Sequence, residues 1–359
     1  MSGTADANEI WILGATGRAG RAIAARLVAA GEAVVLVGRD AARLGEAAGA
    51  LAGECRTVVA DGVEAIAALL PAARPAVVVN TIGPFTRTAL PIARACPPGT
   101  HYVDLANELP AVSGLLGLRD EAVADGRCLV TGAGFGVLGT ESVLLKLCAD
   151  GGPVTRVRVD ALPSVAGEPG ALGTALAASI VEGLAGGGRR YEDGRLVRVR
   201  LGGDVERFTL PDGTAVHSGG VPSGELEAAR RASGAPFVVA ASGAVPAGRV
   251  VRALLPGVAV LLSRRVVADF AVRRLAGIRV AARERGREFS WARARVDGPA
   301  GTRVGWLRTG EAMTFTASVA AEVACRLAHG APPPGAHTPG ALFGPALAEH
   351  AGARFFLDE

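Results

Sequence analysis

The sequence is short of features that would each assign it to a particular class of protein. Its five cysteines lie far apart, with no Cys-x-x-Cys pair and no Cys/His spacing suited to a metal, which disfavours a disulfide-stabilised secreted domain or a zinc module. Its longest apolar window, residues 250–262, is interrupted by Arg252 and is well short of the ~20 residues of a membrane-spanning helix. We therefore expect no metal site, no membrane span and a reducing, cytoplasmic environment.

Concentrated charge is also lacking. The chain has 38 basic and 34 acidic residues and a formal net charge of +4. A nucleic-acid-binding protein normally shows a basic stripe with stacking aromatic side chains, whereas aromatic residues make up only 4% here. We expect no nucleic-acid partner and place the arginine pairs on solvated faces and at helix ends. These pairs are Arg189-Arg190, Arg230-Arg231, Arg264-Arg265 and Arg273-Arg274.

The sequence is long and rich in hydrophobic residues. It has 359 residues, of which 50% are hydrophobic and 20% charged, a composition typical of a globular chain. That length exceeds one ordinary domain of roughly 100 to 200 residues. We place a first domain at 1–150, a second at 151–310, and a helix and tail at 311–359 that are expected to pack back on the first domain. The polar start, residues 1–9, predicts no secretory signal.

The first 150 residues repeat one pattern: a short β-branched run, a Gly or Asp at its end, and then an amphipathic segment rich in Ala, Leu and Arg. This alternation is typical of βαβ units and of a parallel sheet covered on both faces. It predicts an α/β domain with a doubly wound parallel sheet, the Rossmann architecture. The strands are expected at residues 10–13, 33–37, 57–60, 76–80, 101–105 and 128–131.

After residue 150, polar and apolar residues alternate, which indicates half-exposed antiparallel strands. We expect an α+β domain with an open mixed or antiparallel sheet, one face of which is free to meet substrate or a second copy of the chain. Strands are expected at residues 155–159, 195–201, 207–210, 237–241, 289–296 and 302–307, and helices at 170–184 and 312–328.

A glycine-rich turn directly follows the first strand and opens a helix. Glycines in this position allow a tight turn and close backbone approach, while the N–H groups at the positive end of the helix attract phosphates. A purely structural turn is the alternative in a chain with 50 glycines, but the strand-turn-helix context favours a dinucleotide site. The residues of the turn are Gly14, Ala15, Thr16, Gly17, Arg18, Ala19 and Gly20.

Arg39 stands at the end of the second strand, where a site that prefers NADH carries an acidic residue. A guanidinium there can bind a ribose 2′-phosphate through two hydrogen bonds and stack on adenine, so we expect NADPH rather than NADH. The alternative is a solvated Arg39 beside an Asp40 that caps the next helix. Asp61, at the end of the third strand, is expected either to contact the adenine or to cap a helix that starts at Val63.

Three further elements occur in a linked order: Asn80-Thr81-Ile82-Gly83-Pro84-Phe85, then Tyr102-Val103-Asp104 with Glu108, then Gly134-Phe135-Gly136-Val137 with Thr140-Glu141. With these elements and the segment 338–345, the sequence resembles the saccharopine dehydrogenase-like reductases, a family that includes the trans-acting enoyl reductases. The resemblance is dense over residues 9–142 and thin in the second domain. One departure is Asn107, which stands where the family has Gly before the Glu.

The resemblance implies hydride transfer from a nicotinamide cofactor, with the segment from Asn80 to Phe85 lining that cofactor. A Gly-Pro pair after a strand makes a rigid turn at the edge where such sheets bind ligands. Phe85 is expected either near the nicotinamide or in the core. Tyr102, Asp104 and Glu108 follow at the same edge and are candidates to supply a proton or to orient substrate; for Asp104, anchoring a loop is the alternative.

Several catalytic signatures are absent. Neither Tyr102 nor Tyr191 is followed four residues later by Lys, so the Tyr/Lys proton-donor pair of the short-chain dehydrogenases is missing. The sequence also lacks a Gly-x-Ser-x-Gly elbow, an HExxH helix and a Gly-x-x-x-x-Gly-Lys phosphate loop. The five histidines are scattered and are expected to be surface or hydrogen-bonded groups, with His217 kept as a substrate-side candidate.

Together these features predict an NADPH-dependent oxidoreductase that reduces a polarised C=C (enoyl) or C=N (imine) bond of a small, partly apolar substrate. The first alternative is a saccharopine-type amino-acid dehydrogenase, which needs carboxylate-binding arginines such as Arg87, Arg94 or Arg158. The second alternative is a sensor or scaffold that binds NADP without turnover. The open sheet also offers a surface for homo-oligomerisation.

Overall fold

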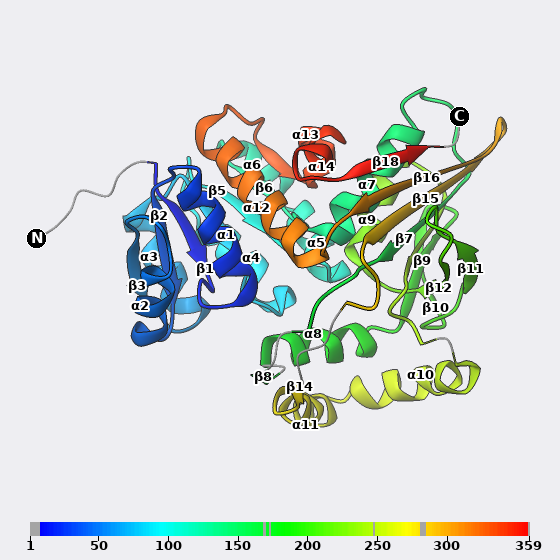
Figure 1. Ribbon diagram of the computed structural model, residues 1–359, viewed down its shortest axis with the longest axis horizontal. Helices are drawn as coiled ribbons and strands as arrows, with labels where there is room; N and C mark the ends of the chain where they lie inside the picture. The colour runs from blue at the N-terminus through cyan, green and yellow to red at the C-terminus, as the bar shows by residue number, and fades with distance from the viewer. Residues whose placement is uncertain (1–7, 168–169, 172–173, 247, 281–284, 358–359) are drawn as a thin grey trace, which may run out of the picture. The chain divides into compact units, whose positions relative to one another are not determined.

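The computed structural model describes residues 8–167, 170–171, 174–246, 248–280 and 285–357 (Figure 1). Most of the polar start at 1–9 therefore lies outside the described residues. The chain forms two compact units, and neither unit is continuous in sequence. The first consists of Met1–Ala106, Pro110–Gly134 and Met313–Leu342, and the second of Asn107–Leu109, Phe135–Ala312 and Phe343–Glu359.

The first unit is built on a seven-stranded sheet in which all pairs are parallel. Its order, β17-β6-β5-β4-β1-β2-β3, contains the doubly wound strand order and confirms the predicted fold class. The strands are β1 (Ile10–Leu13), β2 (Val34–Gly38), β3 (Arg56–Val59), β4 (Val77–Asn80), β5 (His101–Asp104), β6 (Cys128–Val130) and β17 (Gly335–His337).

Helices follow these strands along the chain and cover the sheet. Strands β1 and β4 are buried along their whole length, because βαβ connections place helices on both faces. Helix α1 buries Gly20, Ile23, Ala24 and Leu27, a spacing that puts all four positions on one face. The helices are α1 (Arg18–Ala29), α2 (Ala41–Gly49), α3 (Gly62–Ala73), α4 (Phe85–Ala95), α5 (Leu109–Leu116), α6 (Arg119–Ala124), α12 (Ala312–His329) and α13 (Pro339–Phe343).

The second unit contains a nine-stranded sheet. Its main path is β10-β9-β13-β7-β15-β16-β18, and β11 and β12 join it at β13. Strands β13 and β7 pair in parallel while the other pairs are antiparallel, so the predicted mixed sheet is confirmed. The strands are β7 (Arg156–Leu162), β9 (Gly188–Glu192), β10 (Arg195–Val199), β11 (Glu206–Thr209), β12 (Ala215–Gly220), β13 (Phe237–Ser242), β15 (Ser290–Gly298), β16 (Gly301–Thr309) and β18 (Arg354–Leu357).

The two faces of this sheet differ. Helices α7 (Phe135–Leu147) and α9 (Gly224–Ser233) pack on one face, where small residues allow close approach; a Cβ at Gly139 would lie 3.3 Å from the Cβ of Ala292. The other face carries an aromatic cluster that includes Trp291 and Trp306. Both tryptophans are buried, so the face expected to be free is partly covered within the unit itself.

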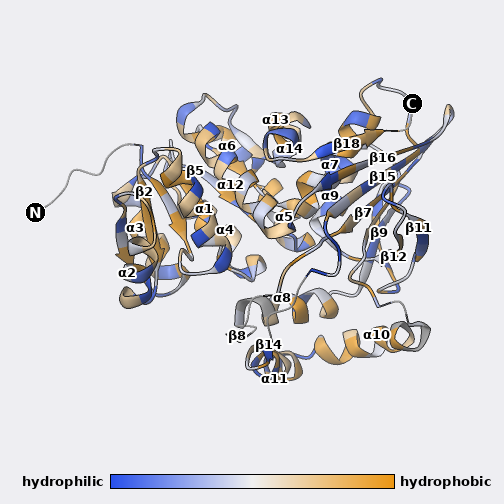
Figure 2. Cartoon of the chain, in the orientation of Figure 1, coloured by the Kyte–Doolittle hydropathy of each residue, from blue (hydrophilic) through white to orange (hydrophobic). Residues whose placement is uncertain are grey.

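A separate helical layer completes the second unit. Helix α8 (Thr174–Ala185) packs against α10 (Arg249–Leu262) and α11 (Arg265–Ala276). The short strands β8 (Gly170–Ala171) and β14 (Arg279–Val280) pair beside it. The helix expected at 170–184 is thus observed from 174, while 172 and 173 lie outside the described residues. Figure 2 shows the hydrophobic colour along much of α10; none of the described helices is both long and apolar enough to cross a membrane.

The division of the chain differs from the expected boundaries at 150 and 310. Helix α7 belongs to the second unit because it packs against α9, β15 and β16. The second unit therefore contains Phe135–Ala312, as well as the short segment Asn107–Leu109. The tail is divided as well. Strand β17 extends the parallel sheet of the first unit, whereas α14 (Ala346–His350) and β18 belong to the second unit, where β18 pairs with β16.

Candidate dinucleotide-binding site

The glycine turn after β1 requires its first and third glycines for different reasons. Gly14 has a φ of +75°, and a Cβ there would lie 2.8 Å from Thr81 Oγ1. At Gly20 a Cβ would lie 2.5 Å from the carbonyl oxygen of Gly14, so the start of α1 can pack against the turn only without a side chain. Both contacts are those of a dinucleotide-binding turn, in which strand and helix approach closely.

The middle glycine is the exposed one. Gly17 is the N-cap residue of α1, and no side chain caps the helix there. Its N–H donates to Gly14 O at 2.9 Å, which closes the turn, and Arg21 holds the loop by donating to Thr16 O at 2.6 Å. An uncapped helix start behind an exposed glycine offers backbone N–H groups to an anion. The turn therefore fits a pyrophosphate group.

The ends of β2 and β3 carry exposed polar side chains. Arg39 is exposed directly after β2. Asp40 is the N-cap residue of α2, and its Oδ1 accepts a hydrogen bond of 3.1 Å from Arg43 N, which confirms the capping role considered for it. Asp61 occupies the N-cap position of α3 without a side-chain capping bond and is exposed. The guanidinium and the Asp61 carboxylate are thus accessible at neighbouring strand ends.

The turn after β4 is held by the side chains of three residues. Asn80 is fully buried; its Oδ1 accepts from Ile82 N at 3.0 Å, and its Nδ2 donates to Thr88 Oγ1 at 3.3 Å. Thr88 in turn donates to Ile82 O at 2.6 Å. Thr81 donates to the carbonyl oxygen of Leu13 at 2.7 Å, which ties this turn to the glycine turn. The sequence predicted that both turns share the carboxyl edge of the sheet, and they do.

The segment from Gly83 to Phe85 leads from this turn into α4. The Gly83–Pro84 peptide bond is cis, and Pro84 is the N-cap residue of α4. Phe85 packs against a buried cluster of the first unit yet keeps part of its surface accessible. It therefore contributes to the core while part of the residue remains accessible to a ligand. The cluster consists of Ala106, Ala111, Val112 and Leu116.

Tyr102 and Asp104 form a buried polar network with Asn80. Asn80 Nδ2 donates to the Tyr102 hydroxyl at 3.0 Å, and that hydroxyl donates to Asp104 Oδ2 at 3.0 Å. Asp104 Oδ1 accepts from Ala106 N, Thr131 Oγ1 and Gly132 N at 3.0, 2.8 and 3.1 Å. The network therefore joins the carboxyl ends of β4, β5 and β6.

Burial governs the protonation of this network. Tyr102 and Asp104 are both fully buried. Removal from water raises the pKa of Asp104 to about 6, while its four hydrogen bonds oppose that rise, and burial raises the pKa of Tyr102 well above its ordinary value. A group without solvent access is better placed to hold the turns in position than to exchange a proton with substrate. Catalysis by either residue stays a prediction.

Glu108 lies in the other unit. The chain passes from the first unit to the second between Ala106 and Asn107, so the three residues expected at one strand end, Tyr102, Asp104 and Glu108, are not brought together within one unit. Glu108 accepts from Ser179 Oγ at 2.8 Å and from Asn107 N at 3.2 Å. The Asn107 side chain donates to Glu225 Oε1 at 3.4 Å, which gives the unusual residue at this position a local partner.

Glu225 is a buried carboxyl group that the sequence did not single out. Its Oε2 has no hydrogen-bond partner among the described residues, and burial raises its pKa. A side chain at Gly136 would collide with Glu225 Oε1, so the glycine of the Gly-Phe-Gly-Val element makes room for it. Nothing in the sequence around Glu225 marks it, because α9 carries three other charged residues and the burial of Glu225 comes from tertiary packing.

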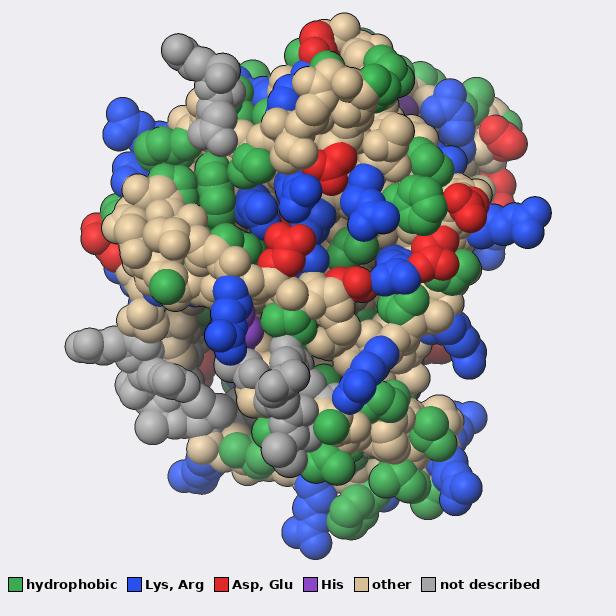
Figure 3. All heavy atoms as spheres, turned by 90° about the vertical axis from the view of Figure 1, so that its right-hand side faces the viewer, with side chains coloured by type: hydrophobic (Ala, Val, Ile, Leu, Met, Phe, Trp, Pro, Cys, Tyr) green, Lys and Arg blue, Asp and Glu red, His purple; other side chains and the backbone are tan. Residues whose placement is uncertain are grey.

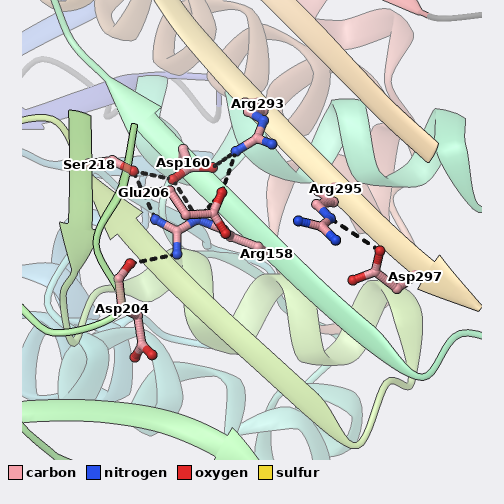
Figure 4. Close-up of polar contacts among 8 residues, drawn as sticks. All are labelled: Arg158, Asp160, Asp204, Glu206, Ser218, Arg293, Arg295 and Asp297. Atoms are coloured by element: carbon pink, nitrogen blue, oxygen red, sulfur yellow. Dashed lines mark hydrogen bonds and ion pairs between the residues drawn. The ribbon is translucent and has the colours of Figure 1, made fainter. Parts of the chain in front are cut away.

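The arginines considered as carboxylate ligands already have partners. Arg158 donates to Asp160 Oδ1, Ser218 Oγ and the Asp204 carbonyl oxygen at 3.0, 2.9 and 2.7 Å (Figure 4). Arg293 adds a second positive charge, with contacts of 3.2 Å to Asp160 and 3.0 Å to Glu206, and Glu206 offsets it. Arg94 forms a two-bond pair with Glu121.

The histidine candidates are also engaged. His217 Nε2 is 2.9 Å from the carbonyl oxygen of Val245, and His101 Nδ1 accepts from Cys128 N at 3.0 Å. His329 pairs with Glu32 at 2.8 Å. These contacts match the expectation that the histidines are hydrogen-bonded or surface groups. In the described part of the chain, no group of three or more His, Cys, Asp or Glu residues could hold a metal ion.

The seven-stranded parallel sheet and its glycine turn place the first unit in the class of Rossmann dinucleotide-binding folds. Comparison with known proteins agrees. The chain is 34% identical over 134 residues to a trans-acting enoyl reductase of Mycobacterium tuberculosis and, over the same length and identity, to one of Mycobacterium ulcerans. Each match covers 35% of this chain and 32% of the relative, so the matched part is about a third of those proteins.

The fold of the whole chain is also known from a solved structure. Saccharopine dehydrogenase (L-Glu forming) from Saccharomyces cerevisiae superposes with a TM-score of 0.58 at 12% identity, covering 98% of this chain and 100% of that one. No family model matches the sequence. The resemblance to the saccharopine dehydrogenase-like reductases is thus confirmed in sequence over about a third of the chain and in fold over nearly all of it.

Proposed function

We propose that the chain is an NADPH-dependent oxidoreductase. The observation that carries this proposal is the glycine turn of the first unit, which exposes an uncapped helix start, together with an exposed Arg39 at the end of β2. The helix start suits the pyrophosphate, and the guanidinium suits a ribose 2′-phosphate. Asp61, accessible at the end of β3, is proposed to contact the adenosine part.

The residues after β4 would position the reactive end of the cofactor. When bound, the nicotinamide supplies the hydride, so the protein need contribute orientation and charge. Asn80 and Thr81 fix the backbone from 80 to 82 through their hydrogen bonds, and Phe85 offers its accessible face. Tyr102 and Asp104 lock that turn against β5 and β6 from within the sheet.

For the substrate we propose a small, partly apolar molecule with a polarised C=C or C=N bond. The names of the enoyl reductase relatives support C=C reduction, and so does the absence of a Tyr-x-x-x-Lys pair suited to carbonyl reduction. The saccharopine-type alternative loses one of its candidates, because Arg158 is neutralised by Asp160. A non-catalytic NADP-binding sensor or scaffold remains an alternative, which the binding and turnover assays distinguish from the reductase. Homo-oligomerisation stays a prediction that is compatible with each of these functions.

The first test is a fluorescence titration of NADPH and NADH with wild type and Arg39→Ala. We expect wild type to prefer NADPH, and Arg39→Ala to weaken NADPH binding about tenfold to hundredfold, the value of one or two charge-assisted hydrogen bonds. NADH affinity should change little, because NADH has no 2′-phosphate. Arg195→Ala, which changes an exposed arginine of the second unit, is the matched control and should bind like wild type.

Turnover assays then distinguish the reductase from the saccharopine-type dehydrogenase and from the sensor. NADPH oxidation with conjugated enones or cyclic imines would support the reductase. NADP+ reduction with amino acids, and none with enones or imines, would favour the saccharopine-type dehydrogenase. Tight NADPH binding without hydride transfer to any of these would favour the sensor, whereas failure to bind either nucleotide would overturn the proposal as a whole.

A further inference from the structure

Helices α10 and α11 leave many large apolar side chains in contact with solvent. Leu254 is 63% exposed, Val260 66% and Val266 80%. Isolated apolar residues on a surface are ordinary, but a contiguous group of them marks an interaction site. The others in this segment are Val251, Val258, Leu261, Phe270 and Ile278, each at least 37% exposed. Together these eight residues are called the α10–α11 surface below.

The exposed residues of α10 form a stripe that the fold of the second unit does not use. Val251, Leu254, Val258 and Leu261 are spaced three or four residues apart, which puts them on one side of the helix. Ala259 is buried and Leu255 and Leu262 are partly buried, and these three occupy a different side. Because α8 already packs against α10, the stripe is available to something outside the unit.

The same segment is strongly basic. Residues 249–280 contain seven arginines and a single acidic residue, Asp269. Five of the arginines are exposed beside the apolar residues: Arg264 and Arg265 at the start of α11, Arg273 and Arg274 in its last turn, and Arg279 shortly after it. The lower end of the molecule in Figure 3, which α10 and α11 form, shows hydrophobic side chains interleaved with Lys and Arg.

We propose that the α10–α11 surface binds the surface of an anionic phospholipid bilayer. Helices that lie in a membrane interface combine inserted Leu, Val and Phe side chains with arginines at the level of the headgroups, and a guanidinium binds phosphate through two hydrogen bonds. A net charge of +6 over residues 249–280, from seven arginines and one aspartate, matches a negative surface. None of the described helices can span a membrane, so this is association with one face.

Charge also argues against a second copy of the chain on this surface. In a two-fold dimer the same patch meets itself, so the arginines of one copy would face those of the other with one aspartate from each to offset them. Such a contact would bury the apolar side chains but place like charges together. An anionic partner covers both features of the surface at once.

The test is vesicle flotation of the full chain with phosphatidylcholine alone and with phosphatidylcholine mixed with phosphatidylglycerol. We expect the chain to float with the mixed vesicles only, and less of it at high salt, because salt screens the arginines. Leu254→Glu combined with Phe270→Glu should abolish binding. Arg264→Ala combined with Arg265→Ala should weaken it at least about tenfold, since each basic residue near such a surface contributes about one factor of five.

The matched control is Leu196→Glu, which changes another exposed apolar residue, on β10 of the same unit, and should bind like wild type. Circular dichroism melting shows whether each variant is folded; the arginine pair is exposed, so its variant tests the proposal even where the glutamates disturb α10. Equal binding to both vesicle types, or binding unaffected by either double variant, overturns the proposal. So does a dimer, seen by analytical ultracentrifugation, that the glutamate variant dissociates.

Discussion

Asp104 is a carboxyl group with no access to solvent, surrounded by four donors at the end of β5. Burial raises its pKa from 3.8 to about 6, so the native protein holds this proton more tightly than the unfolded chain does. The resulting stabilisation is complete below about pH 4 and is lost as the pH rises through 6. The stability of this sheet edge, which carries the proposed cofactor site, is therefore expected to fall as the pH rises through about 6.

We predict that this loss is absent in Asp104→Asn. Between pH 4 and 7, the free energy of unfolding of wild type minus that of Asp104→Asn should fall by up to about 3 kcal/mol, at 1.4 kcal/mol per pKa unit. Urea unfolding of both proteins at several pH values measures this difference in the free energy of unfolding. Asp120→Asn, at an exposed position of α6, should show no comparable trend; a pH-independent difference for Asp104→Asn would mean that the carboxyl keeps its ordinary pKa.

The position of a residue in the fold could be predicted from sequence where its structural neighbours are also close along the chain. The glycine turn, Arg39 and Asp40 could be located because a strand, a turn and a helix follow one another within a few residues. The network around Asp104 could not, because Thr131 reaches it from 27 residues away, and threonine carries no marker of such a role. Glu108 shows the converse, because it is near Asp104 in sequence but belongs to the other unit.

The sheet of the second unit contains its own buried ionic network. Asp160 is fully buried and receives hydrogen bonds from Arg158, Arg293 and Ser218. Strand register explains the arrangement, because Arg293 of β15 stands directly opposite Asp160 of β7. A buried charge is tolerated only while its partners remain, so this network ties β7, β12 and β15 together.

We predict that Asp160→Asn destabilises the second unit by about 3 kcal/mol or more, because it leaves two buried guanidinium groups with only the half-exposed Glu206 to neutralise them. Urea unfolding followed by tryptophan fluorescence reports on it, since Trp291 and Trp306 lie in this unit and Arg293 stacks on the Trp306 ring. Asp297→Asn, which breaks the more exposed pair with Arg295, should cost less than about 1 kcal/mol. Equal effects would refute the role given to burial.

Prediction of elements from sequence succeeded where a pattern is long or repeated. Each of the six predicted strands of the first sheet lies within one residue of its observed start, because each is an apolar run between turn residues. Strand β17 has only three residues, including Gly335, so it carries no alternation to detect. The α10–α11 surface was likewise hidden, because an apolar run such as 250–262 predicts burial until the packing is known.

On the scale of the whole molecule, the first unit is discontinuous in sequence. It takes α12 and β17 from residues 313–342, and β17 covers the β6 edge of the parallel sheet. We predict that a fragment of residues 1–150 folds poorly, since it exposes this edge and the surface that α12 would bury. Residues 1–134 joined by a short glycine-serine linker to 313–342 should fold, because Gly134 lies next to Thr316.

Circular dichroism melting and NADPH titration compare the two proteins. The joined protein should melt cooperatively and should bind NADPH, because it contains the glycine turn and Arg39. Cooperative melting of the 1–150 fragment at the temperature of the joined protein would show that β17 and α12 are dispensable for the first unit.

The distance along the chain between β6 and β17 also matters during synthesis, because β17 is synthesised long after its partner. Strand β6 ends at Val130 and its partner begins at Gly335, so the ribosome adds about two hundred residues, over roughly 10 to 40 s at ordinary elongation rates, before the sheet can be completed. Throughout that interval the edge of β6 is open to another strand. We therefore expect this edge to be open to wrong pairing until β17 has been synthesised.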